Sequence, residues 1–440
     1  MLKAGFSRVD ITPPMGTCIA GYYDERRADG VLDPLLATCL AVSDGENTAL
    51  LFSIDIIGMS QKDSDQARGI ISGMTGVPVE GIFLACTHTH TGPCVSSGLF
   101  ELNLNYNFIM YNLLGNAAIG AIADLHETEV RVARGEAKGI SFIRRYRMND
   151  GSIRTNPGWG NPNVRCPIGS PDEMVQLVRL IRTGAPEINI VNFQTHPDVI
   201  GGTKFSADWP KFVRDTMEGA LPGSKCIFFN GCQGDTNHID ISIDRKKSMD
   251  SCVPGFGYLH SQRMGRVIAG AALQVYDKAL PVSGEGVRFG QTSVFNRANL
   301  PDPALIPHAK EIVALNKAGR DRELPFEGME LVTVVAEAYR MVRLENGPDE
   351  FDLHVTCVSF GDVAFAGLPG EPFTDIGRGI KEASPFPFTI PCCLTNGSEG
   401  YLPTYSAFAE GGYEARSSKF TKGIAEELVV GACNLLKTMR

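Results

Sequence analysis

The stretch GIFLACTHTHTGP, residues 81–93, runs from an apolar segment directly into His88 and His90 and then into a Gly-Pro turn. Such an apolar run is typical of a buried strand, and a strand that ends in imidazoles brings metal ligands or proton carriers to a sheet edge. Because the chain has only 8 histidines in 440 residues, two in this place indicate a functional site. A third histidine, His196, follows a similar run in INIVNFQTHP, residues 188–197.

The roles of the first two histidines stay open at this point. Residues two apart in a regular strand share a face, so His88 and His90 would both reach one metal ion. If the strand ends between them, one binds the metal and the other faces the substrate as base or acid. Two hydrogen-bonded surface histidines are the structural alternative. His196 alone is typical of a structural histidine, but its position at a strand end before Pro197 favours a shared site.

A zinc site usually adds a carboxylate to its nitrogen ligands and, in catalytic sites, leaves one position open for water. Glu371 is the preferred carboxylate, because Gly370 frees the backbone and Pro372 suits the first turn of a helix, which places Glu371 at a predicted helix N-terminus. A helix-capping acid would give the same pattern. Three aspartates are alternative candidates for the carboxylate ligand: Asp55, Asp208 and Asp235.

The composition narrows the class of protein. Apolar residues make up 43% of the chain and charged residues 21%, as in ordinary globular enzymes. The net charge of −9, without a long basic run, argues against nucleic acid or an anionic membrane as partner. The N-terminus has no apolar signal core, no stretch reaches the roughly 18 apolar residues of a membrane helix, and the 12 cysteines form no CxxC pair. We expect a cytoplasmic protein with reduced cysteines, a small-molecule substrate and no stable membrane association; a homo-oligomer stays open.

Apolar runs alternate with amphipathic segments along most of the chain. This alternation predicts an α/β fold in which mixed β-sheets are layered with flanking helices. The predicted strands are 48–57, 82–86, 187–193, 226–229, 287–297, 331–343 and 388–394, with a hairpin at 353–366. The predicted helices are 62–73, 108–125, 209–220, 258–280, 304–318 and 418–437. Only 320–327 is polar enough for a flexible insertion, and we find no domain linker.

Five short motifs occur in the order seen in the neutral/alkaline (non-lysosomal) ceramidase family: THTHTGP at 87–93, THP at 195–197, GDTN at 234–237, GEPF at 370–373 and NGSEGY at 396–401. The opening, GFSRVDITPPMG at 5–16, also resembles the start of that family's catalytic domain. The resemblance spans essentially the whole chain. It implies that residues 1–440 form a single catalytic domain with the layered α/β fold of the ceramidase N-terminal domain.

The resemblance also implies roles for particular residues. Four of them match positions that bind one catalytic zinc: His88, His196, Glu371 and Tyr401. His90 matches the histidine that handles protons, and Tyr413 a second tyrosine lining the site. The arginine that contacts the reacting group corresponds to Arg144, with Arg145 as the alternative.

Two departures from the family pattern bear on the expected reaction. Asn237 stands where the family has a serine, so a serine nucleophile is not expected. The chain ends at Arg440, without the β-sandwich domain that follows in ceramidases. These departures favour a soluble substrate, such as a sugar-acid lactone or a small N-acyl compound, over a sphingolipid.

We therefore hypothesise a zinc-dependent hydrolase of the neutral ceramidase superfamily that cleaves an amide, ester or lactone bond with zinc-activated water. His90 would transfer protons, while Arg144 and Tyr413 would stabilise the oxyanion beside the metal. The alternatives are a ceramidase acting on N-acyl sphingosine, a non-catalytic zinc-containing binding protein and, less favoured, a two-metal phosphatase-like site.

Overall fold

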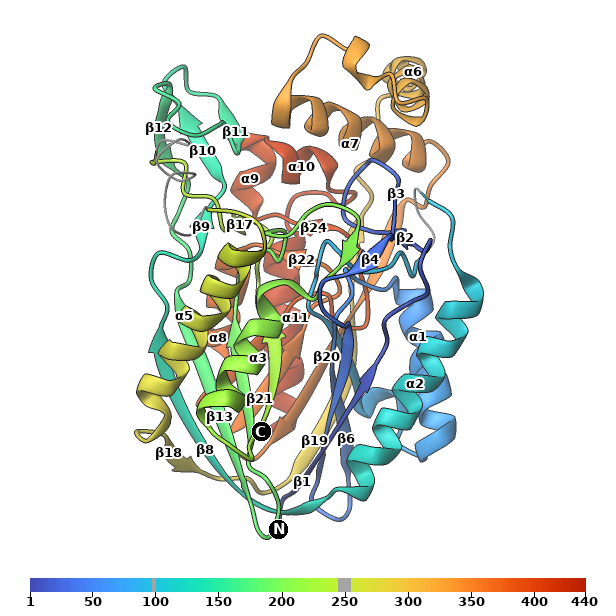
Figure 1. Cartoon of the computed structure of the whole chain (residues 1–440). Coiled ribbons are helices and arrows are strands. Elements are labelled where there is room, and N and C mark those ends of the chain that lie inside the picture. Colours follow the sequence, from blue (N-terminus) through green and yellow to red (C-terminus); the bar gives the residue numbers. More distant parts are fainter. Residues whose placement is uncertain (97–99, 244–254) are drawn as a thin grey trace.

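The computed structural model describes residues 1–96, 100–243 and 255–440. Two β-sheets pack face to face at its centre, and helices cover the outer face of each sheet (Figure 1). The layers run helix, sheet, sheet, helix. The predicted α/β fold of layered mixed sheets with flanking helices is confirmed.

The larger sheet has the strand order β16-β14-β13-β8-β1-β5-β6-β7, with β18 paired to β8. Its strands are β1 (Lys3–Asp10), β5 (Leu36–Ser43), β6 (Thr48–Ile54), β7 (Ile82–Cys86), β8 (His126–Glu136), β13 (Met174–Arg182), β14 (Ile188–Phe193), β16 (Lys225–Asn230) and β18 (Leu280–Val282). Most neighbours are antiparallel, but β6 pairs with β7, and β14 with β16, in parallel. The strands predicted before His88 and His196 are β7 and β14.

The smaller sheet has the order β19-β20-β21-β23. Its strands are β19 (Val287–Arg297), β20 (Glu350–Phe360), β21 (Val363–Gly367) and β23 (Phe388–Cys392). The predicted hairpin is formed by β20 and β21, and β21 pairs with β23 in parallel.

Aromatic side chains fill the layer between the two sheets. Phe83 of β7, Phe229 of β16 and Phe365 of β21 are almost completely buried there, and their ring centroids lie 5.3 to 6.4 Å apart in edge-on arrangements. Such pairs add about 0.5–1.5 kcal/mol beyond the burial of their area. Because β7 and β16 lead directly into candidate site loops, this packing gives those loops a rigid base.

The helices on the outer faces bury one apolar side each. The larger sheet is covered by α1 (Gln61–Thr75), α2 (Leu104–Ala123), α3 (Asp208–Ala220) and α5 (Tyr258–Tyr276). The smaller sheet is covered by α8 (Thr374–Ala383) and α11 (Ile424–Met439). Local sequence sets their ends: the Ser60 hydroxyl accepts a hydrogen bond from the Asp63 amide at the start of α1, and Gly76 ends the helix with a φ of 77°.

One predicted strand is wrong. Residues 331–343 lie within α7 (Gly328–Leu344), which packs against α6 (Ile306–Lys317). The β-branched and apolar residues of this segment suggest a strand, but Val334, Val335 and Ala338 instead bury one helical face against α6. The predicted insertion at 320–327 forms the connection between the two helices and contains the short helix η3 (Asp321–Glu323).

Two predicted helices have different ends. The helix predicted at 258–280 stops at Tyr276, and Leu280 already belongs to β18. The helix predicted at 418–437 begins only at Ile424. Within the described ranges, no helix combines the length and apolar character needed to span a bilayer. All described cysteines are free, and all but Cys166 are buried.

Short elements form the rim of the sheets. They are β2 (Cys18–Ile19), β3 (Arg26–Arg27), β4 (Gly30–Val31), β9 (Phe142–Ile143), β10 (Arg145–Met148), β11 (Ile153–Thr155), β12 (Val164–Pro167), β15 (Lys204–Phe205), β17 (Thr236–Asn237), β22 (Glu371–Pro372), β24 (Tyr401–Leu402), α9 (Tyr405–Glu410), α10 (Tyr413–Ser417), η1 (Val79–Gly81) and η2 (Pro303–Leu305).

Candidate metal centre

The three parallel strand pairs of the two central sheets end at one edge of the molecule. The loops that follow β7, β16 and β23 are joined there by hydrogen bonds: the Asn230 side-chain amide donates to the Thr87 carbonyl at 3.1 Å, and the Cys393 amide donates to the Asn230 carbonyl at 3.1 Å. Because the carboxyl ends of parallel strands meet at one sheet edge, this is where an open α/β fold places its site.

His88 lies just after β7, where the chain leaves the strand. Its φ of 74° is unusual for a residue other than glycine. The ring is held by a hydrogen bond from Nδ1 to the Ile57 carbonyl at 2.7 Å, and Nε2 lies 3.3 Å from Oε2 of Glu371. The strand ends before the two histidines, yet His88 and His90 still lie together, with ring centroids 4.9 Å apart.

His196 lies after β14 and is fully buried. Its Nδ1 faces two backbone carbonyls, those of Gln233 at 2.9 Å and Thr236 at 3.0 Å. Its Nε2 lies 3.0 Å from Oε2 of Glu371. Burial, followed by the nearby positive charge of Arg144, lowers the pKa of His196, so the ring is neutral at neutral pH.

Glu371 is not at a helix N-terminus, which corrects the prediction. It lies in β22, directly opposite Tyr401 in the parallel pair of β22 with β24, and α8 begins only at Thr374. The backbone around Glu371 is extended and pairs with β24, so it cannot form the first turn of a helix. Burial alone would raise the pKa of the Glu371 carboxyl, but positive charge at the imidazoles of His88 and His196 outweighs it and holds this pKa well below its usual range.

The arrangement of acceptor atoms fits a divalent cation. Because Nδ1 of His88 and of His196 donates to backbone carbonyls, each Nε2 presents a lone pair. Both lone pairs face the ionised Oε2 of Glu371 at 3.0 to 3.3 Å, and neither His196 Nε2 nor Glu371 Oε2 forms a hydrogen bond. Acceptor atoms held this close without a donor repel one another, and a bound cation removes the repulsion.

His90 adds a third imidazole to this group. Its Nε2 lies 3.4 Å from Nε2 of His88, and one ring nitrogen from each of His88, His90 and His196 lies within 4.8 Å of the other two, so this group could hold a metal ion. Nδ1 of His90 is buried without a hydrogen-bond partner. Burial, then the neighbouring His88, lowers the pKa of His90 well below its usual value.

Two tyrosines and an arginine lie beside the histidines. The Tyr401 ring lies 6.3 Å from the His196 ring and 5.4 Å from the Tyr413 ring. The Arg144 guanidinium lies over both tyrosine rings, at 5.2 and 6.0 Å, and is fixed by Glu414 at 2.6 Å. Burial raises the pKa of Tyr401 and of Tyr413 well above 10.

The structure separates the two candidate arginines. Arg145 donates to Glu410 at 3.1 Å and to the Gly411 carbonyl at 2.9 Å, and its guanidinium packs on the Phe373 ring at 5.4 Å. The guanidinium that lies over the two site tyrosines is that of Arg144, so of the pair Arg144 is beside the candidate site.

The three competing aspartates are engaged elsewhere. Asp55 forms two hydrogen bonds with Arg214, at 2.9 and 2.6 Å. Asp208 accepts from the Ser261 hydroxyl and from several backbone amides, and Asp235 from the amide and hydroxyl of Thr374. Their oxygens position backbone and helices and do not face the histidines.

Asn237, which stands at the family's serine position, is also engaged. Its side-chain amide donates to the side-chain oxygen of Asn156 at 2.9 Å, and its own side-chain oxygen accepts from the Ile239 amide at 3.0 Å. Asn237 does not line the cavity described next.

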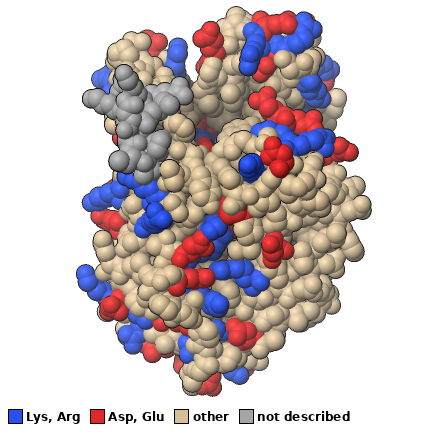
Figure 2. Space-filling view, in the orientation of Figure 1, with Lys and Arg blue, Asp and Glu red and all other residues tan. Residues whose placement is uncertain are grey.

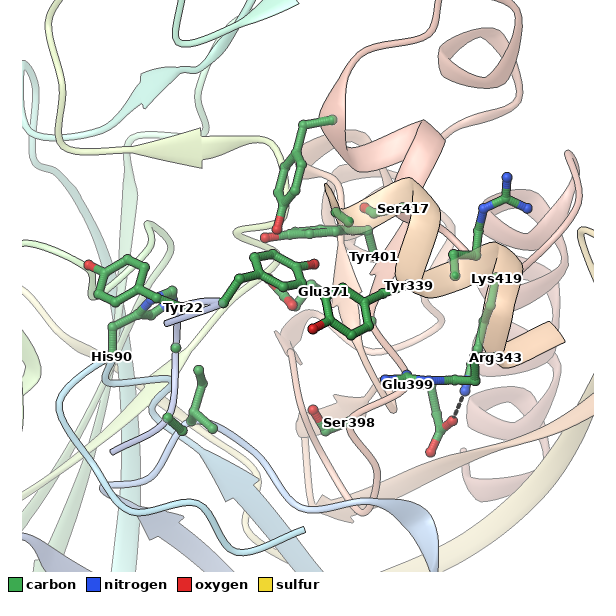
Figure 3. A pocket seen from close by; sticks show the side chains of 18 of the residues that line it. Tyr22, His90, Tyr339, Arg343, Glu371, Ser398, Glu399, Tyr401, Ser417 and Lys419 are labelled. Atoms are coloured by element: carbon green, nitrogen blue, oxygen red, sulfur yellow. Dashed lines mark hydrogen bonds and ion pairs between the residues drawn. The ribbon is translucent and has the colours of Figure 1, made fainter. Parts of the chain in front are cut away.

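A cavity of about 380 Å³ opens beside the histidines. Figure 3 shows His90 and Tyr22 on one side of it, Glu371 and Tyr401 in the middle, and Tyr339, Arg343, Glu399 and Lys419 on the other side. Figure 2 shows the surface hollowed beside the α6–α7 pair, with charges of both signs mixed over this face.

Sequence reasoning missed part of this wall. Tyr22 and Tyr23 line the cavity but were not among the predicted site residues. Tyr339 and Arg343 lie on α7, which was predicted as a strand, so nothing in the sequence placed them at the site.

Comparison with solved structures identifies the fold. The chain is similar to neutral ceramidase from Pseudomonas aeruginosa, with 14% sequence identity and a TM-score of 0.74 over 100% of this chain and 75% of that chain. It is similarly related to a structure of ceramidase complexed with C2, with 14% identity and a TM-score of 0.73 over 100% and 76% of the two chains. No family model matches the chain, and no curated protein matches its sequence. The chain therefore has a neutral ceramidase-like fold, and at this identity the likeness shows the fold alone.

Proposed function

We propose that the protein is a zinc-dependent hydrolase that cleaves an amide, ester or lactone bond of a small molecule. The observation that carries the proposal is the convergence of Nε2 of His88, Nε2 of His196 and Oε2 of Glu371, at 3.0 to 3.3 Å, beside a cavity that His88 and Glu371 line. The neutral ceramidase-like fold supports a hydrolase of this kind.

His88, His196, Glu371 and Tyr401 would hold the zinc ion. Two imidazole nitrogens and a carboxylate are a donor set that suits zinc, and the phenol oxygen of Tyr401 would be the fourth ligand. When bound, zinc supplies Lewis acidity, which activates water at neutral pH and polarises a carbonyl oxygen.

His90 is assigned to proton transfer because its ring is held differently from those of the two ligands. Nδ1 of His88 and of His196 is fixed by backbone carbonyls, whereas Nδ1 of His90 has no partner, so its tautomer is not fixed. Its lowered pKa keeps the ring neutral, so it accepts a proton from the attacking water and then donates it to the leaving group.

Arg144 and Tyr413 are assigned to the oxyanion. The ion pair with Glu414 fixes the guanidinium against the tyrosine rings, and the raised pKa of Tyr413 keeps its hydroxyl protonated as a hydrogen-bond donor. A well-placed donor to a developing oxyanion contributes about 3 kcal/mol to the rate.

The cavity favours a small, polar substrate. A volume of about 380 Å³ lies near the lower end of ordinary ligand pockets. Five tyrosines and several charged side chains line it, which suits a hydroxylated or charged molecule better than two long alkyl chains. N-acyl sphingosine remains the second candidate substrate, because the fold neighbours are ceramidases.

The test combines metal analysis with a substrate panel. We expect about one zinc per chain, and hydrolysis of members of a panel of 4-nitrophenyl esters, lactones and N-acyl amino acids that stops on chelation and returns with zinc. Activity that does not depend on zinc would contradict the proposal. Zinc without turnover over the whole panel, with a short-chain ceramide included, would favour the non-catalytic binding protein, and two metals per chain the two-metal site.

A further inference from the structure

Arg343 is a cation on the cavity wall whose charge nothing nearby neutralises. It lies in the last turn of α7 and lines the cavity. It is exposed, and it forms no ion pair or hydrogen bond with any residue that the structure describes. An arginine that lines a cavity and has no ion pair or hydrogen bond is available to bind a ligand.

The other charged side chains on this side of the cavity are engaged. Lys419 forms an ion pair with Glu399, and Glu399 also accepts a hydrogen bond from the Gln61 amide at 3.3 Å. Arg340 donates to the carbonyls of Asn299 at 2.6 Å and Arg416 at 2.9 Å. These contacts hold the wall in place and leave a positive charge at Arg343.

Arg343 lies across the cavity from the histidines. Figure 3 shows it on the side opposite His90, with Tyr339 between them. The Tyr339 and Tyr23 rings are stacked, with centroids 5.7 Å apart and an angle of 23° between their planes. A molecule whose carbonyl lies at the metal centre therefore extends past tyrosine rings toward the guanidinium.

We propose that the substrate carries a carboxylate remote from the bond that is cleaved, and that Arg343 binds this carboxylate. A guanidinium matches a carboxylate with two parallel hydrogen bonds. A single arginine without a cluster of backbone amides suits a monoanion better than a phosphate. The inference rests on the proposed function, because that proposal places the reacting carbonyl at His88, His196 and Glu371.

The experiment compares matched ester pairs with the zinc-loaded protein. The acidic members are the mono-4-nitrophenyl esters of succinate, glutarate and adipate, and the neutral members are the 4-nitrophenyl esters of butyrate, valerate and hexanoate. The readout is the ratio of kcat/KM for the acidic ester to that for the neutral ester, after subtraction of the reaction without protein. We expect a ratio above ten for at least one chain length, and a fall of about tenfold in Arg343→Gln, expressed mainly in KM.

Charge reversal makes the test directional. Arg343→Glu should invert the preference and raise kcat/KM for the 4-nitrophenyl ester of 4-(trimethylammonio)butyrate. The matched control is Arg322→Glu, which makes the same change of charge at an exposed arginine of the same helix pair, outside the cavity. Equal effects of the two reversals would overturn the proposal, since they would reflect the general field of the protein.

Binding measurements by calorimetry test carboxylate recognition independently of the proposed hydrolysis. Glutarate should bind the zinc-loaded protein about tenfold more tightly than valerate, and Arg343→Gln should remove that difference. If glutarate binding depends on Arg343 while no ester is hydrolysed, carboxylate recognition stands and the hydrolase proposal fails. If zinc-dependent hydrolysis occurs with acidic-to-neutral ratios near one in both wild type and variant, carboxylate recognition fails and the hydrolase stands.

Discussion

The hydrogen bonds at Nδ1 distinguish the three histidines of the candidate site. In His88 and His196 this atom donates to a backbone carbonyl, which fixes the tautomer and directs the Nε2 lone pair at Glu371. In His90 the same atom is buried without a partner. Fixed imidazoles suit metal ligands, whereas nothing fixes the tautomer of His90 at Nδ1.

Substitution of the two kinds of histidine should therefore have different effects. His196→Ala should lose zinc and activity together, whereas His90→Ala should keep zinc and lose turnover by about 10²–10⁴-fold. Zinc content by mass spectrometry and kcat on the best ester measure the two effects, with His126→Ala, a histidine on β8 outside the cavity, as the control. Loss of zinc from His90→Ala would mean that the three imidazoles bind the ion together.

Asp33 makes a separate prediction for stability. It is only 4% exposed, and burial raises the pKa of its carboxyl to about 6, from 3.8, against weaker opposing effects of Ser206 and Lys211. A shift of about two pKa units corresponds to about 3 kcal/mol, which the folded state has below pH 4 and loses as the pH rises through 6. Asp33→Asn should therefore increase the free energy of unfolding by up to about 3 kcal/mol at pH 7.5 and by almost nothing at pH 4.

Denaturant titration at the two pH values tests this prediction. The exposed Asp349→Asn is the control and should show no such dependence on pH. An equal effect of Asp33→Asn at both pH values would contradict the prediction.

Among the elements, the short strand β22 carries Glu371 and is held from two sides. On one side it pairs with β24, which brings Tyr401 beside the carboxylate. On the other side the Gly234 amide donates to the Pro372 carbonyl at 2.8 Å. A side chain on Gly234 has no room, because a Cβ atom would lie 2.3 Å from the Glu371 carbonyl oxygen.

Gly234→Ala should therefore displace β22 and weaken zinc binding by at least tenfold, since metal ligation tolerates little displacement. A competitive zinc titration with a chromogenic chelator measures the affinity. The matched control is Gly69→Ala on the exposed face of α1, where a Cβ meets nothing within 4 Å and alanine favours the helix. Unchanged zinc affinity in Gly234→Ala would show that β22 is not held in this way.

The secondary-structure elements also show which sequence signals were sufficient to predict the fold. The apolar runs before His88 and His196 gave the two strands correctly, because a fully buried strand is continuous in apolar residues. The helix expected after Glu371 starts three residues later, because β22 pairs with β24 across residues far apart in sequence. The strand expected at 331–343 is a helix because its contacts with α6, and not its own β-branched residues, decide its conformation. Local pattern therefore singled out His88, His196 and Glu371, which the structure brings together, but not the cavity wall that faces them.

In the whole molecule, the candidate ligands come from both sheets. His88 and His196 follow strands of the larger sheet, while Glu371 and Tyr401 lie in the short strands β22 and β24, which come after β21 and β23 of the smaller sheet in the chain. One bound ion would therefore connect the two central layers at their common edge. The sequence predicted this convergence through motif order alone; the contacts between layers depend on long-range packing that no local pattern contains.

Removal of the metal should accordingly lower the stability of the whole chain. A ligand present at 1,000 times its Kd stabilises the folded state by about 4 kcal/mol. We expect chelation to lower Tm by several degrees and added zinc to restore it, as measured by calorimetry. His196→Ala should show no shift with zinc, and a wild-type Tm that does not respond to chelation would contradict a zinc link between the sheets.

The most direct test of the account is a crystal structure of the zinc-loaded protein with anomalous data collected on both sides of the zinc edge. The account predicts one strong peak between His88, His196 and Glu371, about 2.0–2.1 Å from the two Nε2 atoms, with Tyr401 adjacent and one position open to the cavity. A chain that binds no zinc, or a peak elsewhere in the molecule, would contradict it.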